Sequence, residues 1–412
     1  MTFGRYGIDW ERRINIDKMR KDRVERARRI ATEHGVDAMI VLDGDNMRYL
    51  GHNLGRGIVQ GSKGYRYMVF PVKSEPILYE FGKWFRYSHD YADWIDIRPA
   101  ASILPEGPEE ARVRQYSKAA ADIKKDLQES GNIKGNILID VYNPGLVNSL
   151  TKEGINLKLG ASEVLSEARM IKTQEEVESI RMASSIAEGG YETLSRSIKP
   201  GLAENELKAI FVGEMYRLGM EYVPSGDVTS GPQTFASHNI TSDRLLRHGD
   251  LAVAQACGSS YNGYKVCLYR TFAAGSASNA AKDSYSTALD ILNDAMKVIK
   301  PGATTKDIAE KWPKAKEFGY KDEDEAIWVQ WSHGIGLSIP EEPTASRLWS
   351  FEFPQKIEEG MTLAIETWIP TTEKSETYPR GQSVRIEQMV HVTETGYDLI
   401  SDFPIDELQV CK

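Results

Sequence analysis

The sequence predicts an α+β protein of two domains: a smaller α/β domain over residues 1–160 and a larger domain over 161–412. Three observations support this prediction. The chain has 412 residues, enough for two or three hydrophobic cores at about 150 residues per domain. Short apolar runs alternate with helical patterns up to residue 160, as in a sheet covered by helices. Beyond that point, a long helical pattern precedes several strand–turn–strand segments.

The first 160 residues alternate between helix and strand patterns. Helices are expected over Asp17–Glu33, which is rich in arginine, and over Arg112–Ser130, which has a polar face. Strands are expected at Ala38–Leu42, Tyr67–Pro71, Pro76–Tyr79 and Asn136–Val141. This alternation predicts a mostly parallel sheet.

A long helix is expected to lead into the second domain. Thr173 and Glu176 have the spacing of a capping box, and apolar residues follow at helical intervals. Further along, SIKPGLAENELKAIF (197–211) resembles VIKPGATTKDIAEKW (298–312). In each copy a helix ends at Lys-Pro-Gly and another begins a few residues later, which suggests two related halves.

Composition excludes several classes of protein. Lysine and arginine number 51 against 60 acidic residues, and the net charge of −9 argues against a nucleic-acid partner. No apolar run reaches the roughly 18 residues that span a bilayer. The three cysteines are too few for a disulfide framework. The polar N-terminal segment lacks the apolar core of a signal peptide, so we expect a cytoplasmic protein.

Two glutamates lie inside apolar, strand-like segments. Glu366 belongs to EEGMTLAIETWIP (358–370) and Glu387 to SVRIEQMVHVT (383–393). Burying an unpaired carboxylate costs several kcal/mol, so a single such glutamate is best explained by exposure across an alternating strand. Two of them on successive strands, with His333 upstream in SHGIGLSIPEEP, favour a shared site.

Two further segments bring the number of candidate site motifs to five. His238 lies in the loop SGPQTFASHNIT, and HGDLAVAQACGSSYNGYKVCLYRTF (248–272) has a strand–turn–strand pattern. Together with the segments around His333, Glu366 and Glu387, these resemble the pita-bread fold of the creatinase and aminopeptidase family, which includes aminopeptidase P, prolidase and creatinase. The resemblance covers about residues 165–405. The first 160 residues match the creatinase-like N-terminal domain by layout.

The resemblance implies five metal-ligand positions, which peptidases of the family fill with Asp, Asp, His, Glu and Glu. His333, Glu366 and Glu387 match the last three. Ala256 and Cys267 stand where the two aspartates should be, and a one-residue shift of the first strand would offer Gln255 or Cys257 instead. Pro340 replaces a second histidine that the peptidases keep.

Without two hard anionic ligands, a dinuclear centre is not expected. We expect the cysteines to be small buried side chains that fill the space of the metals, and we expect no cofactor. A single soft metal ion at Cys267, His333 and Glu366 stays open, because thiolate, imidazole and carboxylate suit zinc or iron.

The resemblance to creatinase and ectoine hydrolase then implies a metal-independent hydrolase that cleaves a C–N bond in a small zwitterionic or guanidino/amidino compound. With no metal to acidify water, an imidazole must take and return the proton. His238 is the predicted general base and acid, Glu366 its orienting or substrate-binding partner, and His333 a second acid/base or hydrogen-bond donor.

The predicted substrate-binding residues line the same motifs. Trp331 and Trp368 adjoin His333 and Glu366 and could hold a cationic group by cation–π attraction, although core packing is the simpler explanation. The resemblance to creatinase implies substrate contacts near Tyr269 and Arg347, and an arginine, Arg66, that reaches across a dimer. The full set is Glu387, Tyr269, Arg347, Trp331, Trp368 and Arg66.

Other functions stay open. The enzymatic alternatives are a lyase acting on a small onium acid, as in the dimethylsulfoniopropionate lyase of the same fold, and an Xaa-Pro-type metallopeptidase. The non-enzymatic alternative is a peptide-binding module. The expected partners are a small-molecule substrate and a second copy of the chain in a homodimer, with neither nucleic acid nor membrane.

Overall fold

A computed structural model of the chain describes residues 13–51, 65–92, 94–235, 239–326, 329–371 and 381–412, and the statements below concern these residues. The chain divides into two compact units. One is Ile16–Arg169, and the other is Met170–Lys412 together with the described residues before Ile16. The division falls near the end of helix α7 (Ala161–Met170) rather than at residue 160.

The first unit is a mixed sheet with strands in the order β4-β3-β2-β1-β5-β6. Strand β2 is antiparallel to both of its neighbours, β1 and β3, whereas the remaining neighbours pair in parallel. The expectation of a mostly parallel sheet therefore misses this hairpin: a short turn joins β2 to β3, and a connection of that length permits only antiparallel pairing. The strands are β1 (Ala38–Val41), β2 (Tyr67–Pro71), β3 (Ile77–Glu80), β4 (Asp96–Pro99), β5 (Ile137–Ile139) and β6 (Leu157–Leu159).

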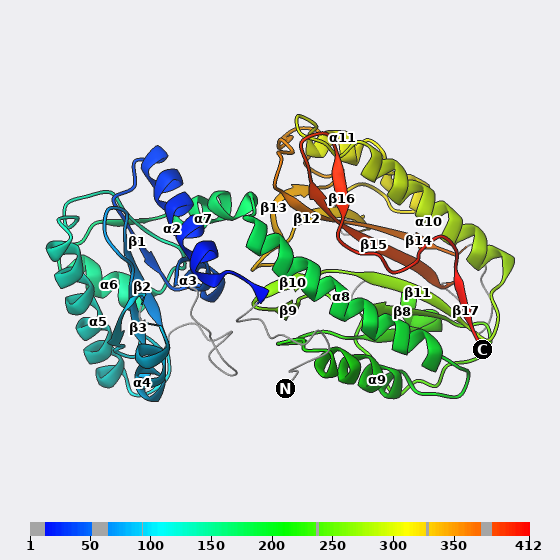
Figure 1. Cartoon of the computed structure of the whole chain (residues 1–412), viewed down its shortest axis with the longest axis horizontal. Coiled ribbons are helices and arrows are strands. Elements are labelled where there is room, and N and C mark those ends of the chain that lie inside the picture. The colour runs from blue at the N-terminus through cyan, green and yellow to red at the C-terminus, as the bar shows by residue number, and fades with distance from the viewer. Residues whose placement is uncertain (1–12, 52–64, 93, 236–238, 327–328, 372–380) are drawn as a thin grey trace. The chain divides into compact units, whose positions relative to one another are not determined.

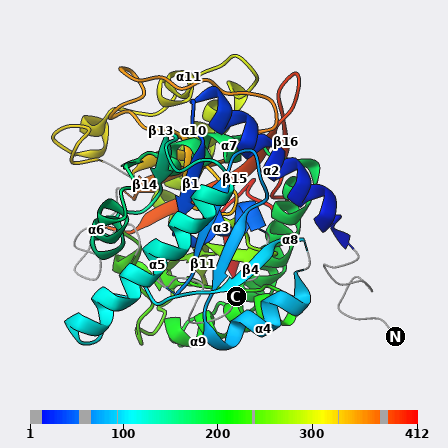
Figure 2. The ribbon, with the colours of Figure 1, turned by 90° about the vertical axis from the view of Figure 1, so that its left-hand side faces the viewer.

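Helices cover the sheet because its strands are apolar on both faces. Ala38 and Ile40 of β1 pack in a cluster with Ile123 of α5 and Leu146 of α6, while Met39 is buried on the other face. Figure 2 shows α5 in front of this sheet. The helices of the unit are α2 (Ile16–Glu33), α3 (Gly44–Gly51), α4 (Gly82–Tyr91), α5 (Glu109–Glu129), α6 (Pro144–Lys152) and α7.

The second unit places two sheets between helices. Figure 1 shows α10 along one outer side and α8 and α9 along the opposite side. The helices are α8 (Gln174–Ser197), α9 (Glu204–Arg217), α10 (Asn279–Lys297), α11 (Thr305–Ala309) and the short 3-10 helices η2 (Gly231–Phe235) and η3 (Ala315–Phe318). No helix among the described residues is long and apolar enough to cross a membrane.

The two sheets have the strand orders β17-β11-β8-β7 and β13-β12-β14-β15-β16, and β9 and β10 form a separate hairpin. The strands of the first sheet are β7 (Val228–Ser230), β8 (Leu251–Gln255), β11 (Tyr269–Ala274) and β17 (Gln409–Cys411). Those of the second are β12 (Gln330–Gly334), β13 (Glu341–Ala345), β14 (Thr362–Pro370), β15 (Ser383–Val392) and β16 (Tyr397–Leu399). The hairpin strands are β9 (Ser259–Tyr261) and β10 (Tyr264–Val266).

Strict alternation along β14 and β15 separates a core face from a polar face. Ile365 and Ile386 belong to the hydrophobic cluster that contains the buried side chains of α10. Their neighbours Glu366 and Glu387 therefore point to the opposite face, and they are paired directly across the two strands. Both glutamates are buried, so the prediction that they share one site has the right geometry.

Candidate active site

The strand–turn–strand segment contributes two cysteines to the site. Gln255 at the end of β8 is the register partner of Tyr269 at the start of β11. Cys257 and Cys267 each lie two residues beyond this pair, toward the turn, and therefore on the same face. Ala256, at the position of the first family aspartate, is fully buried but is not among the residues that line the cavity described below, whereas Cys257 is.

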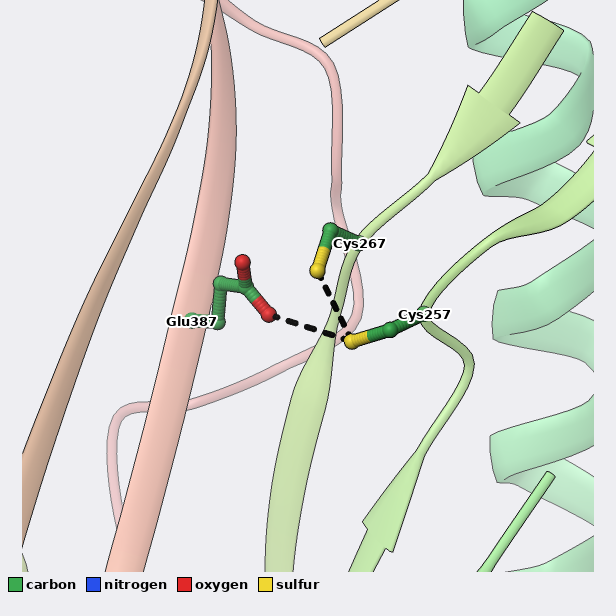
Figure 3. Close-up of side chains that lie close together, drawn as sticks. All are labelled: Cys257, Cys267 and Glu387. Carbon is green, nitrogen blue, oxygen red and sulfur yellow. Dashed lines mark hydrogen bonds between the residues drawn. The ribbon is translucent and has the colours of Figure 1, made fainter. Parts of the chain in front are cut away.

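The thiols meet a glutamate of the facing sheet. The Sγ atoms of Cys257 and Cys267 are 2.8 Å apart, and Cys257 Sγ lies 3.9 Å from Glu387 Oε2. Figure 3 shows Glu387 pointing from β15 toward both cysteines. One donor atom from each of the three residues lies within 4.8 Å of the others. Such a spacing is compatible with a single ion bound by all three side chains.

His333 presents a defined nitrogen to this cluster. Its Nδ1 is 2.8 Å from the carbonyl oxygen of Gly334, so Nδ1 carries the proton and donates it. The lone pair is then on Nε2, which lies 3.8 Å from Glu387 Oε1. That buried oxygen has no hydrogen-bond partner among the described residues.

Glu366 has a different environment from Glu387. Arg385, two residues before Glu387 on β15, donates from Nε and from a terminal nitrogen to Glu366 Oε2, at 3.0 and 2.6 Å. The same guanidinium lies over the ring of Tyr269 at 3.9 Å from its centroid. Glu366 is thus a charge-paired carboxylate, whereas Glu387 faces the thiols.

Burial keeps the cluster close to neutral. Desolvation, together with the charge of Glu366, raises the pKa of Glu387, and desolvation raises the pKa of Cys257 and of Cys267. Desolvation lowers the pKa of His333. Burial therefore favours the uncharged forms of the thiols, the Glu387 carboxyl and the imidazole in the absence of a cation. A bound divalent cation would reverse this preference for the acidic groups.

A cavity of about 310 Å³ is lined by the two thiols and His333, and Glu387 lies behind this lining. Its wall combines polar groups with apolar ones, in the pattern of a small-molecule site. The lining residues are Cys257, Cys267, Tyr269, Trp331, His333, Ile339, Pro340 and Glu366.

The remaining predicted residues lie in several places. Trp331 lines the cavity, while Trp368 and Tyr269 line an adjoining smaller pocket with Arg385 and Asp227. Arg347 lines a separate pocket, where it contacts Glu323 and two backbone carbonyls.

Arg66 belongs to the other unit, where it is buried and paired with Glu80 at 2.9 Å. His238 lies outside the described residues. The substrate-binding and catalytic roles assigned to all these residues stay predictions, as does the homodimer.

One site residue was missed, and another was considered only as an alternative. Arg385 was not singled out, although its place two residues before Glu387 on a strand puts both on one face. Cys257 was considered only as an alternative ligand. It lies two residues after Gln255, the β8 residue that pairs with Tyr269 of β11, and the alternation of side chains places it on the same face.

Residues 178–394, which carry every donor described above, match metallopeptidase family M24. The chain belongs to this family. It is 32% identical over 238 residues to an Xaa-Pro dipeptidase of Pyrococcus furiosus, an alignment that spans 57% of this chain and 64% of that protein. The chain thus matches slightly less than two thirds of that relative's length.

Solved structures confirm the fold. An Xaa-Pro dipeptidase from Bacillus anthracis superposes with a TM-score of 0.72 at 21% identity, over 95% of this chain and 99% of that one. A prolidase from Pyrococcus horikoshii superposes with a TM-score of 0.72 at 21% identity, over 94% and 100%. The predicted pita-bread fold and family are therefore correct.

Family membership corrects two predictions. The main prediction of a metal-independent, creatinase-like hydrolase is wrong, because the chain belongs to a metallopeptidase family and its matched relatives are named as peptidases. The expectation of no cofactor is wrong for the same reason. The loss of two aspartates suggested the absence of metal, and a single soft metal ion was kept only as an alternative.

The donor set of this M24 protein fits a metal, but not a pair of hard ions. Ala256 offers no ligand, and Cys267 offers sulfur where a carboxylate would be needed to neutralise hard cations. Cys257, Cys267 and Glu387 form a close group of sulfur and oxygen donors, and His333 adds a nitrogen 3.8 Å from the other Glu387 oxygen; this combination suits one borderline or soft ion. The unpartnered Glu387 oxygen is consistent with a ligand at this point.

Proposed function

We propose that this M24 family hydrolase is a metal-dependent peptidase that acts on small peptides of the Xaa-Pro type. The observation that supports it most is the convergence of Cys257, Cys267, His333 and Glu387 near a cavity of small-molecule size. The names of the matched relatives, Xaa-Pro dipeptidase and prolidase, support the substrate class.

Within such a site, the metal would polarise the scissile carbonyl and acidify water. The chain's own residues supply position and charge. Glu366 lines the cavity with a carboxylate that Arg385 holds in place, and this carboxylate can accept a hydrogen bond from an N–H group of the peptide. Trp331 and Pro340 offer apolar surface for a proline ring.

The test is hydrolysis of a panel of free dipeptides by the full chain. The panel contains Xaa-Pro dipeptides, the reversed Pro-Xaa dipeptides and Xaa-Ala dipeptides, assayed before and after treatment with a chelator. We expect cleavage of Xaa-Pro substrates that the chelator abolishes and that at least one of the added ions, Zn²⁺, Co²⁺ and Mn²⁺, restores. Absence of cleavage with every metal, or undiminished cleavage in excess chelator, would contradict the proposal.

A further inference from the structure

We propose that Cys257, Cys267, Glu387 and His333 form a mononuclear, thiolate-bearing centre that takes one zinc-like ion per chain instead of a pair of hard ions. This inference deepens the proposed function and rests on its metal dependence. It assigns two cysteines a direct role as ligands.

The distances suit one ion. Zinc binds sulfur at about 2.3 Å and nitrogen or oxygen at about 2.0–2.2 Å, so ligand atoms on one ion lie within roughly 4.6 Å of each other. The separations are 2.8 Å between the two Sγ atoms, 3.9 Å from Cys257 Sγ to Glu387 Oε2, and 3.8 Å from His333 Nε2 to Glu387 Oε1. In a tetrahedral site the two sulfurs lie about 3.7 Å apart, so the thiols would have to separate by about 1 Å. The His333 imidazole, which lies beside Glu387 but outside the group of three close donors, would have to move toward the thiols.

The histidine is already prepared for coordination. Metal-binding histidines usually donate the proton of their second ring nitrogen to a carbonyl or carboxylate, which fixes the tautomer and the ring. His333 does so through Nδ1 to the Gly334 carbonyl, and β12 holds the residue in register with β14. Its Nε2 lone pair, 3.8 Å from Glu387 Oε1, is therefore available for a metal ion without the cost of changing tautomer.

The described residues offer a second divalent ion no suitable place beside the first. Ala256 stands at the position of the first aspartate, and its methyl group cannot bind an ion. The other candidate ligand, Glu366, already accepts two hydrogen bonds from Arg385 at Oε2. A second cation at Glu366 would lie next to this guanidinium and would be repelled by it. The guanidinium thus supplies the positive charge that a second ion would bring.

The donors also decide which ion binds. Two thiolates favour Zn²⁺, Co²⁺ or Fe²⁺, whereas Mn²⁺ and Mg²⁺ prefer sites built from oxygen. We therefore expect tight binding of zinc and cobalt and weak binding of manganese.

The experiment uses the full chain, stripped of metal and kept reduced without oxygen. Zn²⁺ is titrated with native mass spectrometry as the readout of stoichiometry, and Co²⁺ with absorption spectroscopy as the readout of ligand type. We expect one ion per chain and an intense sulfur-to-cobalt charge-transfer band. In Cys257→Ser and Cys267→Ser the band should weaken and zinc affinity should fall at least about 100-fold.

Cys411→Ser is the matched control, because Cys411 is also a buried cysteine but lies on β17, outside the cluster. It should keep both the band and the affinity. Two ions per chain, a cobalt complex without the band, or unchanged affinity in the double variant Cys257→Ser/Cys267→Ser would overturn the inference. So would a protein that binds no metal after reduction but forms a Cys257–Cys267 disulfide in air.

These outcomes separate the two proposals. A single thiolate-bound ion without cleavage of any Xaa-Pro dipeptide would leave the metal centre standing and contradict the substrate class. Chelator-sensitive cleavage with two ions per chain, unaffected by the cysteine substitutions, would support the peptidase and contradict the centre.

Discussion

At the residue scale, the site depends on which neighbour, Ala256 or Cys257, faces the cavity. The family motif places the first aspartate at Ala256, whose methyl side chain cannot bind a metal ion. Cys257 follows the last residue pair of β8 and β11, where side-chain direction depends on the exact register. The two glutamates could be predicted because they lie inside strands with a clear apolar pattern. The register at the end of a strand is not specified by a local pattern, so Cys257 could be considered only as an alternative.

Replacing Cys267 with aspartate should change metal preference. Cys267→Asp exchanges a soft ligand for a hard one at the position where the family has a carboxylate, so the ratio of zinc to manganese affinity should fall by at least about tenfold. Calorimetric titration with each ion measures the ratio. Cys267→Ser, which removes sulfur without adding charge, should weaken zinc binding and gain no manganese affinity; an equal gain in both variants would contradict the assignment.

Asp227 provides a prediction for pH. Burial alone would raise its pKa, but hydrogen bonds from Lys208, Thr241 and Ser225 outweigh burial and lower the pKa from 3.8 to about 2. A lowered acid pKa stabilises the folded state above pH 3.8, and this contribution disappears as pH falls toward 2.

Asp227→Asn should therefore lower the free energy of unfolding by about 1–3 kcal/mol near neutral pH. The difference from the wild type should shrink as pH falls below about 4. Urea unfolding at several pH values measures it. Asp398→Asn, at an exposed side chain, serves as the control and should change stability by less than about 0.5 kcal/mol. A difference that grows toward low pH would contradict this account of Asp227.

At the scale of elements, local signals predicted most of the fold. The predicted strand Tyr67–Pro71 is β2, and the predicted capping box lies at the start of α8. Lys-Pro-Gly follows the ends of α8 and α10, and new helices begin at Glu204 and Thr305. These features depend on neighbours in sequence. The packing of β15 against the segment around Cys267, for example Met389 against Cys267, joins residues more than a hundred positions apart, and no local pattern specifies it.

The capping box of α8 can be tested directly. Thr173 Oγ1 accepts from the Glu176 amide and Glu176 Oε2 accepts from the Thr173 amide, at 3.2 and 2.7 Å. Thr173→Ala leaves that Glu176 amide without its cap, so the free energy of unfolding should fall by about 1 kcal/mol. Chemical denaturation measures the loss. Thr173→Ser keeps the hydroxyl and should restore most of it; an equally destabilised serine variant would argue against capping.

At the scale of the whole molecule, the described donors of the proposed centre all belong to one compact unit. Cys257, Cys267, His333 and Glu387 lie in Met170–Lys412, and the hydrophobic cluster around α5 lies in Ile16–Arg169. The stability of the first core and the affinity of the metal site should therefore vary independently.

Ile123 tests this independence, because it is fully buried in the cluster of the first unit. Ile123→Ala should cost about 2–5 kcal/mol of stability in that unit. Zinc affinity of the folded protein should stay within about twofold, since additive behaviour is expected for distant sites. Thermal unfolding and calorimetric titration of the same preparation measure the two quantities, and a parallel loss of zinc affinity would show that the units are coupled.

The number of metal ions per chain tests the central claim most directly. The measurement is native mass spectrometry of the reduced, full-length protein after saturation with Zn²⁺ and removal of excess metal. One zinc ion per chain, absent from the variant Cys257→Ser/Cys267→Ser, is the predicted result. Two ions per chain, retained in that variant, would contradict it.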